Sequence, residues 1–227
     1  RPMTPSPSVP GPILLVNPNS NEAVTEGMRD AVAALAFPGA PALECLTLAE
    51  GPFGVQTQVE SDQVVIPLAK LVKSRPDASG FVICCYSDPG IDACRSVAAC
   101  PVFGIQECGV LAAMARADRF GVIAIAEPSV RRHRLYMRRM GVLDRLAGEI
   151  PLNMTVAESH SGEGTFARLE EVGGQLIAQG SEAIVLGCAG MARHRKGLED
   201  RLGVPVIDPV QAAAAMALTT AMLRAAA

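Results

Sequence analysis

Short runs of valine, isoleucine and leucine recur along the chain and alternate with stretches of helical periodicity. The predicted strands are Ile13–Val16, Leu43–Leu48, Gly80–Cys85, Val102–Gly104, Phe120–Ile125, Ala183–Gly187 and Val204–Ile207. The predicted helices are Glu22–Leu35, Gln58–Lys73, Val110–Ala117, Glu163–Ala178 and Val210–Leu223, with one more that has Pro128 in its first turn. The less regular segment Gly141–Ser161 is expected to hold a strand at Ile150–Val156 and then a loop, HSGEG. Several strand runs are apolar throughout, as in parallel strands buried on both faces, so the pattern predicts an α/β fold with parallel sheets.

Two segments far apart in the chain share one pattern. Both contain a strand, a cysteine, a short helix, a strand and a helix. One passes through Cys85 to PVFGIQECGVLAAMA, and the other passes through Cys188 to PVIDPVQAAAAMA. Such a repeat predicts two similar half-structures that face each other, with one cysteine from each half in a shared cleft. The alternative is that similar βα units recur in any α/β protein.

The composition argues against several classes of protein. Hydrophobic residues make up 49% of the 227 residues, which is enough for a sizeable core. A net charge of −3 with 4% aromatic residues argues against a nucleic-acid partner. No apolar run has the length of a transmembrane helix, so no membrane partner is expected. Residues 1–11 lack the apolar core of a signal peptide and are expected to be a flexible leader, which favours a cytoplasmic protein.

The chain has seven cysteines and three histidines. The cysteines are Cys45, Cys84, Cys85, Cys94, Cys100, Cys108 and Cys188. Their odd number argues against a disulfide framework, and the absence of CxxC or Cys/His knuckle spacing argues against a metal site. The histidines (His133, His160 and His194) are isolated, so packing or solvent exposure is expected for each. The basic stretch RRHRLYMRRM is expected to be a solvated helix face.

Cys85 and Cys188 each end an apolar run and are followed by small or turn-forming residues. Open α/β sheets place their binding sites at the carboxyl ends of the strands. A thiol near a helix N-terminus ionises more easily, and two anions in one small cleft would repel each other. One thiolate and one thiol on opposite faces of a substrate carbon make a two-base racemase without a cofactor. Cys84 should point to the opposite face of its strand, and the other cysteines are expected to pack in helices or strands.

Further groups are expected near the same edge of the sheet. The backbone N–H groups that follow the two cysteines are candidate donors to an enolate oxygen, and they belong to Tyr86, Ser87, Ala189 and Gly190. In ILLVNPNSN, Asn17 and Ser20 are interpreted as turn and N-cap residues, as polar groups of the cleft, or as both. Glu107 either reaches the cleft or only favours a helix N-terminus.

Together these motifs resemble the Asp/Glu/hydantoin racemase superfamily, and within it the hydantoin and allantoin racemase branch. NPNSN resembles the branch's opening Asn-Pro-Asn motif, CYSDPG its first cysteine motif, PVFGIQE the stretch that follows, and AIVLGCAGM with VPVIDPV its second cysteine motif and closing strand. The resemblance runs from Ile13 to about Leu223. It implies two pseudosymmetric α/β subdomains with the active site in the cleft between them, no cofactor and no metal, and it places the acid–base pair on Cys85 and Cys188. We expect one unit over residues 12–227, made of intertwined subdomains of roughly 12–104 plus 208–227 and 105–207.

The chain departs from related racemases at positions that bear on the substrate. The Cys-Asn-Thr and Gly-Cys-Thr motifs of the amino-acid racemases are here Cys-Tyr-Ser and Gly-Cys-Ala, which disfavours free aspartate or glutamate. Tyr86 replaces the usual phenylalanine of the branch and adds a hydroxyl. Where related racemases tend to have a Thr-Thr pair, this chain has Ala124 and Ile125, which suit an apolar substituent better than a small polar ligand such as allantoin.

We therefore predict a cofactor-independent racemase of 5-substituted hydantoins or a related ureide, a small-molecule enzyme. The alternatives are an allantoin racemase, a decarboxylase or cis–trans isomerase on the same scaffold, and a small-ligand-binding protein that has lost catalysis. We also expect a homo-oligomer, because the apolar last helix, Pro209–Ala227, would suit a partner subunit, although core packing explains it equally well.

Overall fold

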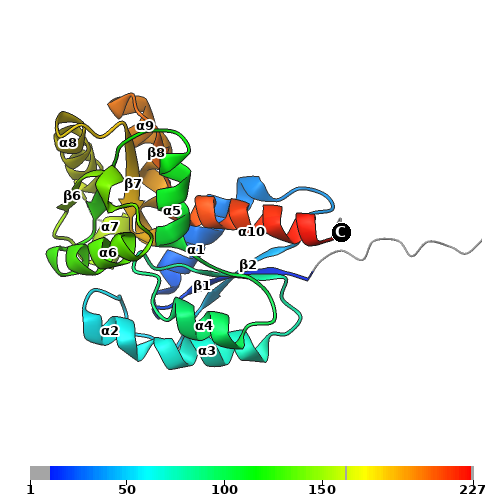
Figure 1. Ribbon diagram of the computed structural model, residues 1–227. Coiled ribbons are helices and arrows are strands. Elements are labelled where there is room, and N and C mark those ends of the chain that lie inside the picture. Colours follow the sequence, from blue (N-terminus) through cyan, green and yellow to red (C-terminus); the bar gives the residue numbers. More distant parts are fainter. Residues whose placement is uncertain (1–10, 162, 226–227) are drawn as a thin grey trace, which may run out of the picture.

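The computed structural model describes residues 11–161 and 163–225, and its strands form two four-stranded parallel sheets (Figure 1). The strands are β1 Ile13–Asn17, β2 Leu43–Thr47, β3 Gly80–Ile83, β4 Val102–Gly104, β5 Phe120–Ala124, β6 Leu146–Pro151, β7 Ala183–Gly187 and β8 Val206–Ile207. The helices are α1 Glu22–Val32, α2 Gln58–Gln63, α3 Val65–Ser74, α4 Ile91–Val97, α5 Ile105–Met114, α6 Glu127–Arg139, α7 Val156–Ser161, α8 Thr165–Ala178, α9 Arg195–Leu202 and α10 Pro209–Ala225. Short 3-10 turns are η1 Ala33–Leu35, η2 Leu143–Arg145 and η3 Ala189–His194.

The two sheets repeat one topology. Their strand orders, β2-β1-β3-β4 and β6-β5-β7-β8, become identical when β1 is matched to β5 and the count continues from there. The α-helices match in the same way, from α1 with α6 to α5 with α10. This confirms the expected pair of similar α/β half-structures, in which β3–α4–β4–α5 and β7–α9–β8–α10 are the two equivalent segments.

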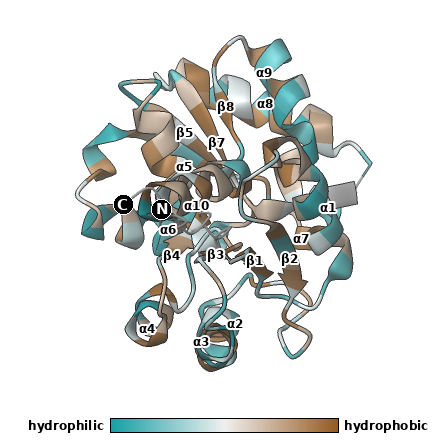
Figure 2. Ribbon diagram, turned by 90° about the vertical axis from the view of Figure 1, so that its right-hand side faces the viewer, coloured by the Kyte–Doolittle hydropathy of each residue, from teal (hydrophilic) through white to brown (hydrophobic). Residues whose placement is uncertain are grey.

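The inner strands are apolar throughout because helices cover both faces of each sheet. Every residue of β1, β3, β5 and β7 is buried. Figure 2 shows the strands as mostly hydrophobic, whereas the outer helices mix hydrophobic and hydrophilic residues. The strand β2 at the edge of the first sheet is only partly buried. In β1 the burial extends through its last residue, Asn17, so the core reaches the carboxyl edge of the sheet, where the loops begin.

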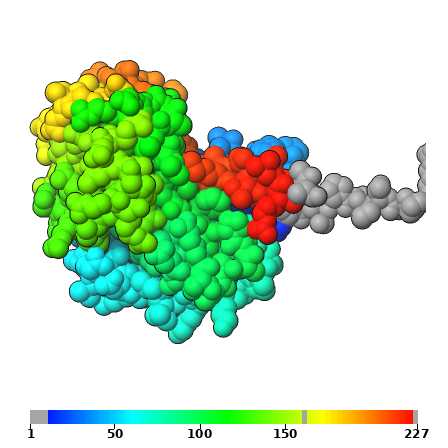
Figure 3. Space-filling model, in the orientation of Figure 1, coloured from blue at the N-terminus to red at the C-terminus, as the bar shows by residue number. Residues whose placement is uncertain are grey.

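Each half ends in a helix that also packs against the other half. Helix α5 contacts β5, β7 and β8 of the second sheet, and α10 contacts β1, β3 and β4 of the first sheet as well as α5. Figure 1 shows α10 alongside the first sheet, and Figure 3 shows the outer face of this helix, in red, at the surface. Core packing therefore accounts for much of the apolar character of this helix. Met222 and Leu223 near its end are exposed, and the homo-oligomer stays a prediction.

Several expected boundaries differ from the observed ones for local reasons. The helix expected over Gln58–Lys73 breaks at Val64, because Pro67 has no N–H to bond the carbonyl of the residue four before it. The strand expected at Ile150–Val156 is wrong: β6 ends at Pro151, and α7 starts at Val156. Thr155 and Glu158 form a capping box at the start of α7.

The HSGEG loop falls partly in α7, and its Gly162 lies outside the described residues, as do residues 1–10 of the expected leader. No helix of the described segments is long and apolar enough to cross a membrane.

The buried side chain of Asp88 joins the loop after β3 to the start of α5. Its two carboxylate oxygens accept the backbone N–H groups of Gln106 and Glu107, each at 2.9 Å. Gly104 leaves room for this contact, since a Cβ there would lie 2.2 Å from the Asp88 carboxyl carbon. The carboxylate therefore satisfies two free donors of the α5 N-terminus and fixes the turn that carries Cys85.

Replacement of Asp88 should therefore destabilise the protein. We expect Asp88→Ala to lower the free energy of unfolding by about 2 kcal/mol, because two buried N–H groups lose their acceptor. Asp88→Asn retains one acceptor oxygen and should lose about half as much. Asp92→Ala is the control, because Asp92 pairs with Arg139 at the exposed surface and should change stability by less than about 1 kcal/mol. Urea denaturation measures all three, and equal losses for Asp88→Ala and Asp92→Ala would contradict the capping role.

Candidate active site

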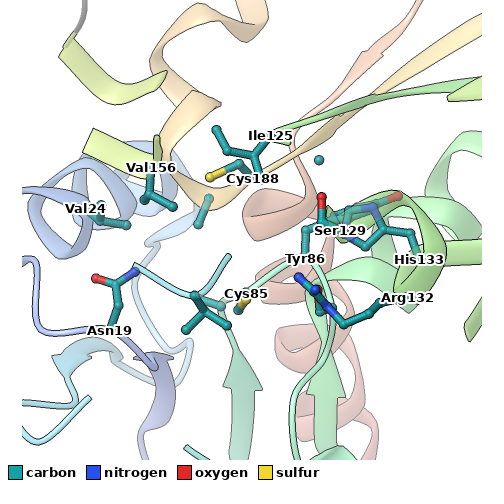
Figure 4. A pocket seen from close by; sticks show the side chains of 15 residues that line it. Asn19, Val24, Cys85, Tyr86, Ile125, Ser129, Arg132, His133, Val156 and Cys188 are labelled. Atoms are coloured by element: carbon teal, nitrogen blue, oxygen red, sulfur yellow. The ribbon is translucent and has the colours of Figure 1, made fainter. Parts of the chain in front are cut away.

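Cys85 and Cys188 line one pocket between the two halves, at the carboxyl ends of β3 and β7. The pocket is small, with a cavity volume of about 30 Å³. Its walls come from both halves: Asn19, Val24, Val55, Cys84, Cys85, Tyr86 and Ser87 from the first, and Ile125, Ser129, Arg132, His133, Val156, Gly187, Cys188 and Ala189 from the second. Figure 4 shows the two cysteines on opposite sides of this space. The structure thus brings together the two equivalent thiols of the two halves.

Cys188 follows β7 directly and begins the 3-10 turn η3. Its Sγ accepts the Gly190 N–H at 3.4 Å and lies 3.8 Å from the hydroxyl oxygen of Ser159 in α7. Burial raises the pKa of the Cys188 thiol, and the hydrogen bonds from Gly190 and Ser159 oppose that rise. Ser159 also donates to the Val156 carbonyl at 2.8 Å, so its single proton must leave that carbonyl before it can stabilise a thiolate.

Cys85 lies in a turn and not at a helix N-terminus. Its carbonyl accepts the N–H groups of Ser87 and Asp88, and α4 begins only at Ile91. Burial, and after it the charge of Cys188, raises the pKa of the Cys85 thiol to about 12, whereas Arg132 lowers this pKa. The expectation that the thiol ionises more easily because a helix follows is therefore wrong for Cys85.

Cys84 and Cys85 pack on different sides of the first sheet, as the alternation of side chains along a strand predicts. Cys84 belongs to the large core cluster shared with the second half, and Cys85 packs against the smaller cluster under α3 and α4. Cys84 is nevertheless part of the pocket wall. Burial raises its pKa well above the ordinary value, and its Sγ contacts the Val82 carbonyl, so it stays a neutral thiol.

The residues expected to bind substrate divide into two groups. Tyr86, Ser87, Ile125 and Ala189 line the pocket. Asn17, Ser20, Glu107, Ala124 and Gly190 do not.

Four of these five make the following contacts, and Glu107 is described below. The Asn17 side chain holds Asn19, Asn21 and Thr25, and Ala124 is fully buried within β5. Ser20 donates its N–H to the Pro52 carbonyl. The Gly190 N–H is bound to the Cys188 sulfur.

Glu107 serves the fold at the start of α5. Its carboxylate accepts the Gly104 N–H at 3.4 Å and the Tyr136 hydroxyl at 2.8 Å, and it forms an ion pair with Arg95. Of the two interpretations given for this residue, the structure therefore supports the helix N-terminus and not the cleft.

Asn19 is a pocket residue that the sequence pattern did not single out. Its Oδ1 accepts from Asn17 Nδ2 at 3.0 Å and from the Asn21 N–H at 3.0 Å, which fixes the amide. Figure 4 shows its nitrogen directed toward the centre of the pocket. The signal was present in NPNSN, but the turn contains several asparagines, and the sequence alone does not say which one faces the cleft.

Arg132 and His133 are also pocket residues, although the basic stretch was expected to be a solvated helix face. Ser129, His133 and Met137 are buried at a spacing of four along α6, so this side of the helix faces inward. Arg132 lies next to that side and half-buried, with its guanidinium directed into the pocket (Figure 4). The spacing of serine, histidine and methionine was the available signal.

At the pocket wall, His133 forms a buried pair with Glu149. His133 Nδ1 lies 2.6 Å from Glu149 Oε1, and the imidazole meets the Tyr86 ring edge-on at 4.9 Å between centroids. Arg134 lies 3.6 Å from the second oxygen of Glu149. This cluster positions Tyr86, which is the residue that follows Cys85.

The hydroxyl of Tyr86 is buried and has no hydrogen-bond partner within the described residues. Tyr86→Phe should therefore leave the free energy of unfolding unchanged or raise it by about 1 kcal/mol, since an unpaired buried polar group is removed. Tyr136→Phe is the matched control: its hydroxyl donates to Glu107 at 2.8 Å, and its loss should cost about 2 kcal/mol. Thermal and urea unfolding compare the two variants. A destabilised Tyr86→Phe would show that this hydroxyl has a partner.

Comparison with known proteins supports the class that this fold and pocket indicate. The family model for Asp/Glu/hydantoin racemase matches residues 13–217. A hydantoin racemase of Paenarthrobacter aurescens is 34% identical over 213 residues, a span that covers 90% of this chain and 89% of that protein. The chain belongs to the Asp/Glu/hydantoin racemase family. The prediction of an isomerase of the racemase type is thereby confirmed.

Solved structures agree with the fold. An allantoin racemase from Klebsiella pneumoniae superposes with a TM-score of 0.89 at 27% identity, covering 95% of this chain and 89% of that one. An arylmalonate decarboxylase superposes with a TM-score of 0.64 at 19% identity, covering 93% of this chain and 92% of that one, a likeness of fold alone. The prediction of two parallel-sheet α/β halves is confirmed.

Proposed function

We propose that the chain is a cofactor-independent racemase of 5-substituted hydantoins or a related ureide, with Cys85 and Cys188 as its acid–base pair. The observation that carries this proposal is the placement of both thiols in one pocket, at equivalent strand ends of the two halves. The same placement supports a division into subdomains 12–104 plus 208–227 and 105–207. The hydantoin racemase of Paenarthrobacter aurescens supports the substrate class.

The proposed reaction needs only two proton transfers. One cysteine, as thiolate, takes the C5 proton and becomes a thiol, and the electron pair left on C5 delocalises onto the adjacent carbonyl oxygen. The other cysteine, as thiol, gives its proton to the opposite face of C5 and becomes the thiolate. The reverse reaction exchanges the two roles, so the enzyme returns to its starting state after two opposite turnovers.

Backbone donors beside each cysteine can stabilise the enolate oxygen. The N–H groups of Ser87 and Gly190 are engaged with the cysteines themselves, the first with the Cys85 carbonyl in the turn and the second with the Cys188 sulfur. No hydrogen bond within the described residues occupies the N–H groups of Tyr86 and Ala189. One donor next to each thiol suits a reaction that must run in both directions, because each face of the substrate meets the same arrangement.

The pocket wall favours an apolar group at C5. Val24, Val55, Ile125 and Val156 line the pocket, and all four are buried. Such a wall stabilises an alkyl or aryl substituent by removing it from water. The ureido substituent of allantoin would need polar partners, which makes allantoin the second candidate despite the likeness to an allantoin racemase.

A decarboxylase, an isomerase of another type and a binding protein receive less support. A decarboxylase of the arylmalonate type shares the fold alone with this chain, and it would leave one of two equivalent thiols without a use. No relative or solved structure described above is a cis–trans isomerase, so that alternative has no support from the comparisons. A binding protein without catalysis would not need two thiols across one pocket.

An enantiopure 5-benzylhydantoin in deuterated buffer tests the reaction. We expect loss of the C5 proton signal in proton NMR together with decay of the circular dichroism, both faster than without protein. Cys85→Ser and Cys188→Ser should each lower the rate of dichroism decay about 10²–10⁴-fold, because a serine hydroxyl is a poor acid and base at this position. Cys100→Ser, a half-buried thiol outside the pocket, should keep the full rate.

Three outcomes would count against the proposal. If either pocket variant keeps near-full racemisation, the two-base assignment is wrong. If 5-benzylhydantoin is not racemised but allantoin is, the preference for an apolar substituent is wrong. If neither compound loses its C5 proton faster than in the blank, the substrate class is wrong.

A further inference from the structure

Arg132 is an unusual cation because it lies half-buried in the pocket without a carboxylate partner. Its Nη2 donates to the Gln56 carbonyl at 3.0 Å, its Nη1 to the Pro128 carbonyl at 3.2 Å and its Nε to the Ser87 hydroxyl at 3.4 Å. Within the described residues no carboxylate lies within ion-pair distance of it, whereas Arg134 and Arg139 of the same helix pair with Glu149 and Asp92. This guanidinium is partly removed from water, and all its hydrogen-bond partners are uncharged. A nearby anion would therefore stabilise it.

The position of Arg132 identifies which anion it can serve. It reaches from α6 of the second half across the pocket to the residues around Cys85 in the first half, and Figure 4 shows its guanidinium on the Cys85 side. Burial lowers the pKa of Arg132, and the groups that oppose this effect are Cys85 first and then Glu60 and Asp62 of α2. Burial raises the pKa of Cys85 most, Cys188 and Asp88 raise it further, and Arg132 and the Ser87 N–H lower it.

The second thiol is supported differently. Cys188 has the Gly190 N–H at 3.4 Å and the Ser159 hydroxyl at 3.8 Å, and these two hydrogen bonds are what oppose the effect of burial on its pKa. The two halves therefore stabilise their thiolates by unlike means: hydrogen-bond donors for Cys188, and a charge brought in from the opposite half for Cys85.

We propose that Arg132 is the counter-ion of the Cys85 thiolate, a positioning residue that allows this cysteine to act as a base. The proposal rests on the acid–base role given to Cys85 above. When Cys85 loses its proton, the negative charge on sulfur is balanced by a guanidinium that the Ser87 hydroxyl and the Gln56 carbonyl hold in place. When Cys85 is a thiol, the same cation is available to the carbonyl oxygen of the substrate, where charge develops.

Alkylation by iodoacetamide tests the proposal without a substrate. The reagent is neutral and reacts with the thiolate, so its rate reports the ionised fraction. Mass spectrometry of peptide fragments separates the labels on Cys85 and Cys188, and the ratio of the two rates corrects for any change in access to their shared pocket. At pH 9, Arg132→Gln should lower the Cys85 to Cys188 ratio about tenfold or more, which corresponds to a rise of one unit in the pKa of Cys85.

Two variants separate charge from shape. Arg132→Lys keeps the charge and should restore much of the ratio, although it cannot make the same forked contacts. Arg131→Gln removes the neighbouring arginine, which is exposed and outside the pocket, and should leave the ratio unchanged. An unchanged ratio in Arg132→Gln, or equal losses in the glutamine and lysine variants, would overturn the proposal.

Racemisation kinetics then show what the counter-ion does for catalysis. The two enantiomers have equal energy, so kcat/KM must fall by the same factor in both directions, and we expect at least a tenfold fall in Arg132→Gln with Arg131→Gln within twofold of wild type. If the wild-type protein does not racemise the hydantoin but the alkylation ratio still falls, the proposed function is wrong and the counter-ion assignment stands. If the wild-type protein racemises the hydantoin but the alkylation ratio does not change in Arg132→Gln, the counter-ion assignment is wrong and the proposed function stands.

Discussion

A charge on one of two thiols that share a small pocket opposes the ionisation of the other, and this repulsion is the constraint on which the site depends. Burial raises the pKa of Cys85 and of Cys188, and a charge on Cys188 raises the pKa of Cys85 further. The favoured state is therefore one in which at most one is ionised, and this is the state that a two-base proton transfer requires. The protein meets this requirement with two copies of one topology and the exchanged helices α5 and α10, which hold the ends of β3 and β7 opposite each other.

The symmetry that places the thiols does not extend to their surroundings. Cys188 begins η3 and takes a hydrogen bond from it, whereas Cys85 lies in a turn that Asp88 ties to the neighbouring helix α5. A strand–cysteine–helix pattern in the sequence is the same in both halves, but the distance from the cysteine to the first helical residue is not. The electrostatic argument from helix N-termini consequently applies to Cys188 only. The thiolate of Cys85 depends instead on Arg132, a side chain from the other half.

Much of the fold and part of the site could be predicted from the sequence, because the relevant signals are local. Apolar runs mark the inner strands, since both faces of a parallel strand are buried, and the pattern repeated around Cys85 and Cys188 marks the two halves. Asn19, Arg132 and His133 could not be predicted in the same way. Their place in the pocket depends on how α6 and the loop after β1 are rotated toward the other half, which is a matter of packing between distant segments. Glu107 is the opposite case. Its place in the sequence made it a candidate for the cleft, but its carboxylate binds Gly104, Tyr136 and Arg95.

The chain departs from related racemases at both Ala124 and Ile125, but only one of these two residues lines the pocket. Ala124 is fully buried in β5 and leaves the pocket unchanged, so only Ile125 takes part in the wall. There it joins Val24, Val55 and Val156, which come from three different segments of both halves. An isoleucine at this point therefore extends an apolar wall that the rest of the chain already supplies. The pocket also contains polar groups, among them the side chains of Asn19 and Arg132 and the two free backbone N–H groups. A pocket with both kinds of group suits a substrate that has a polar ring and an apolar substituent.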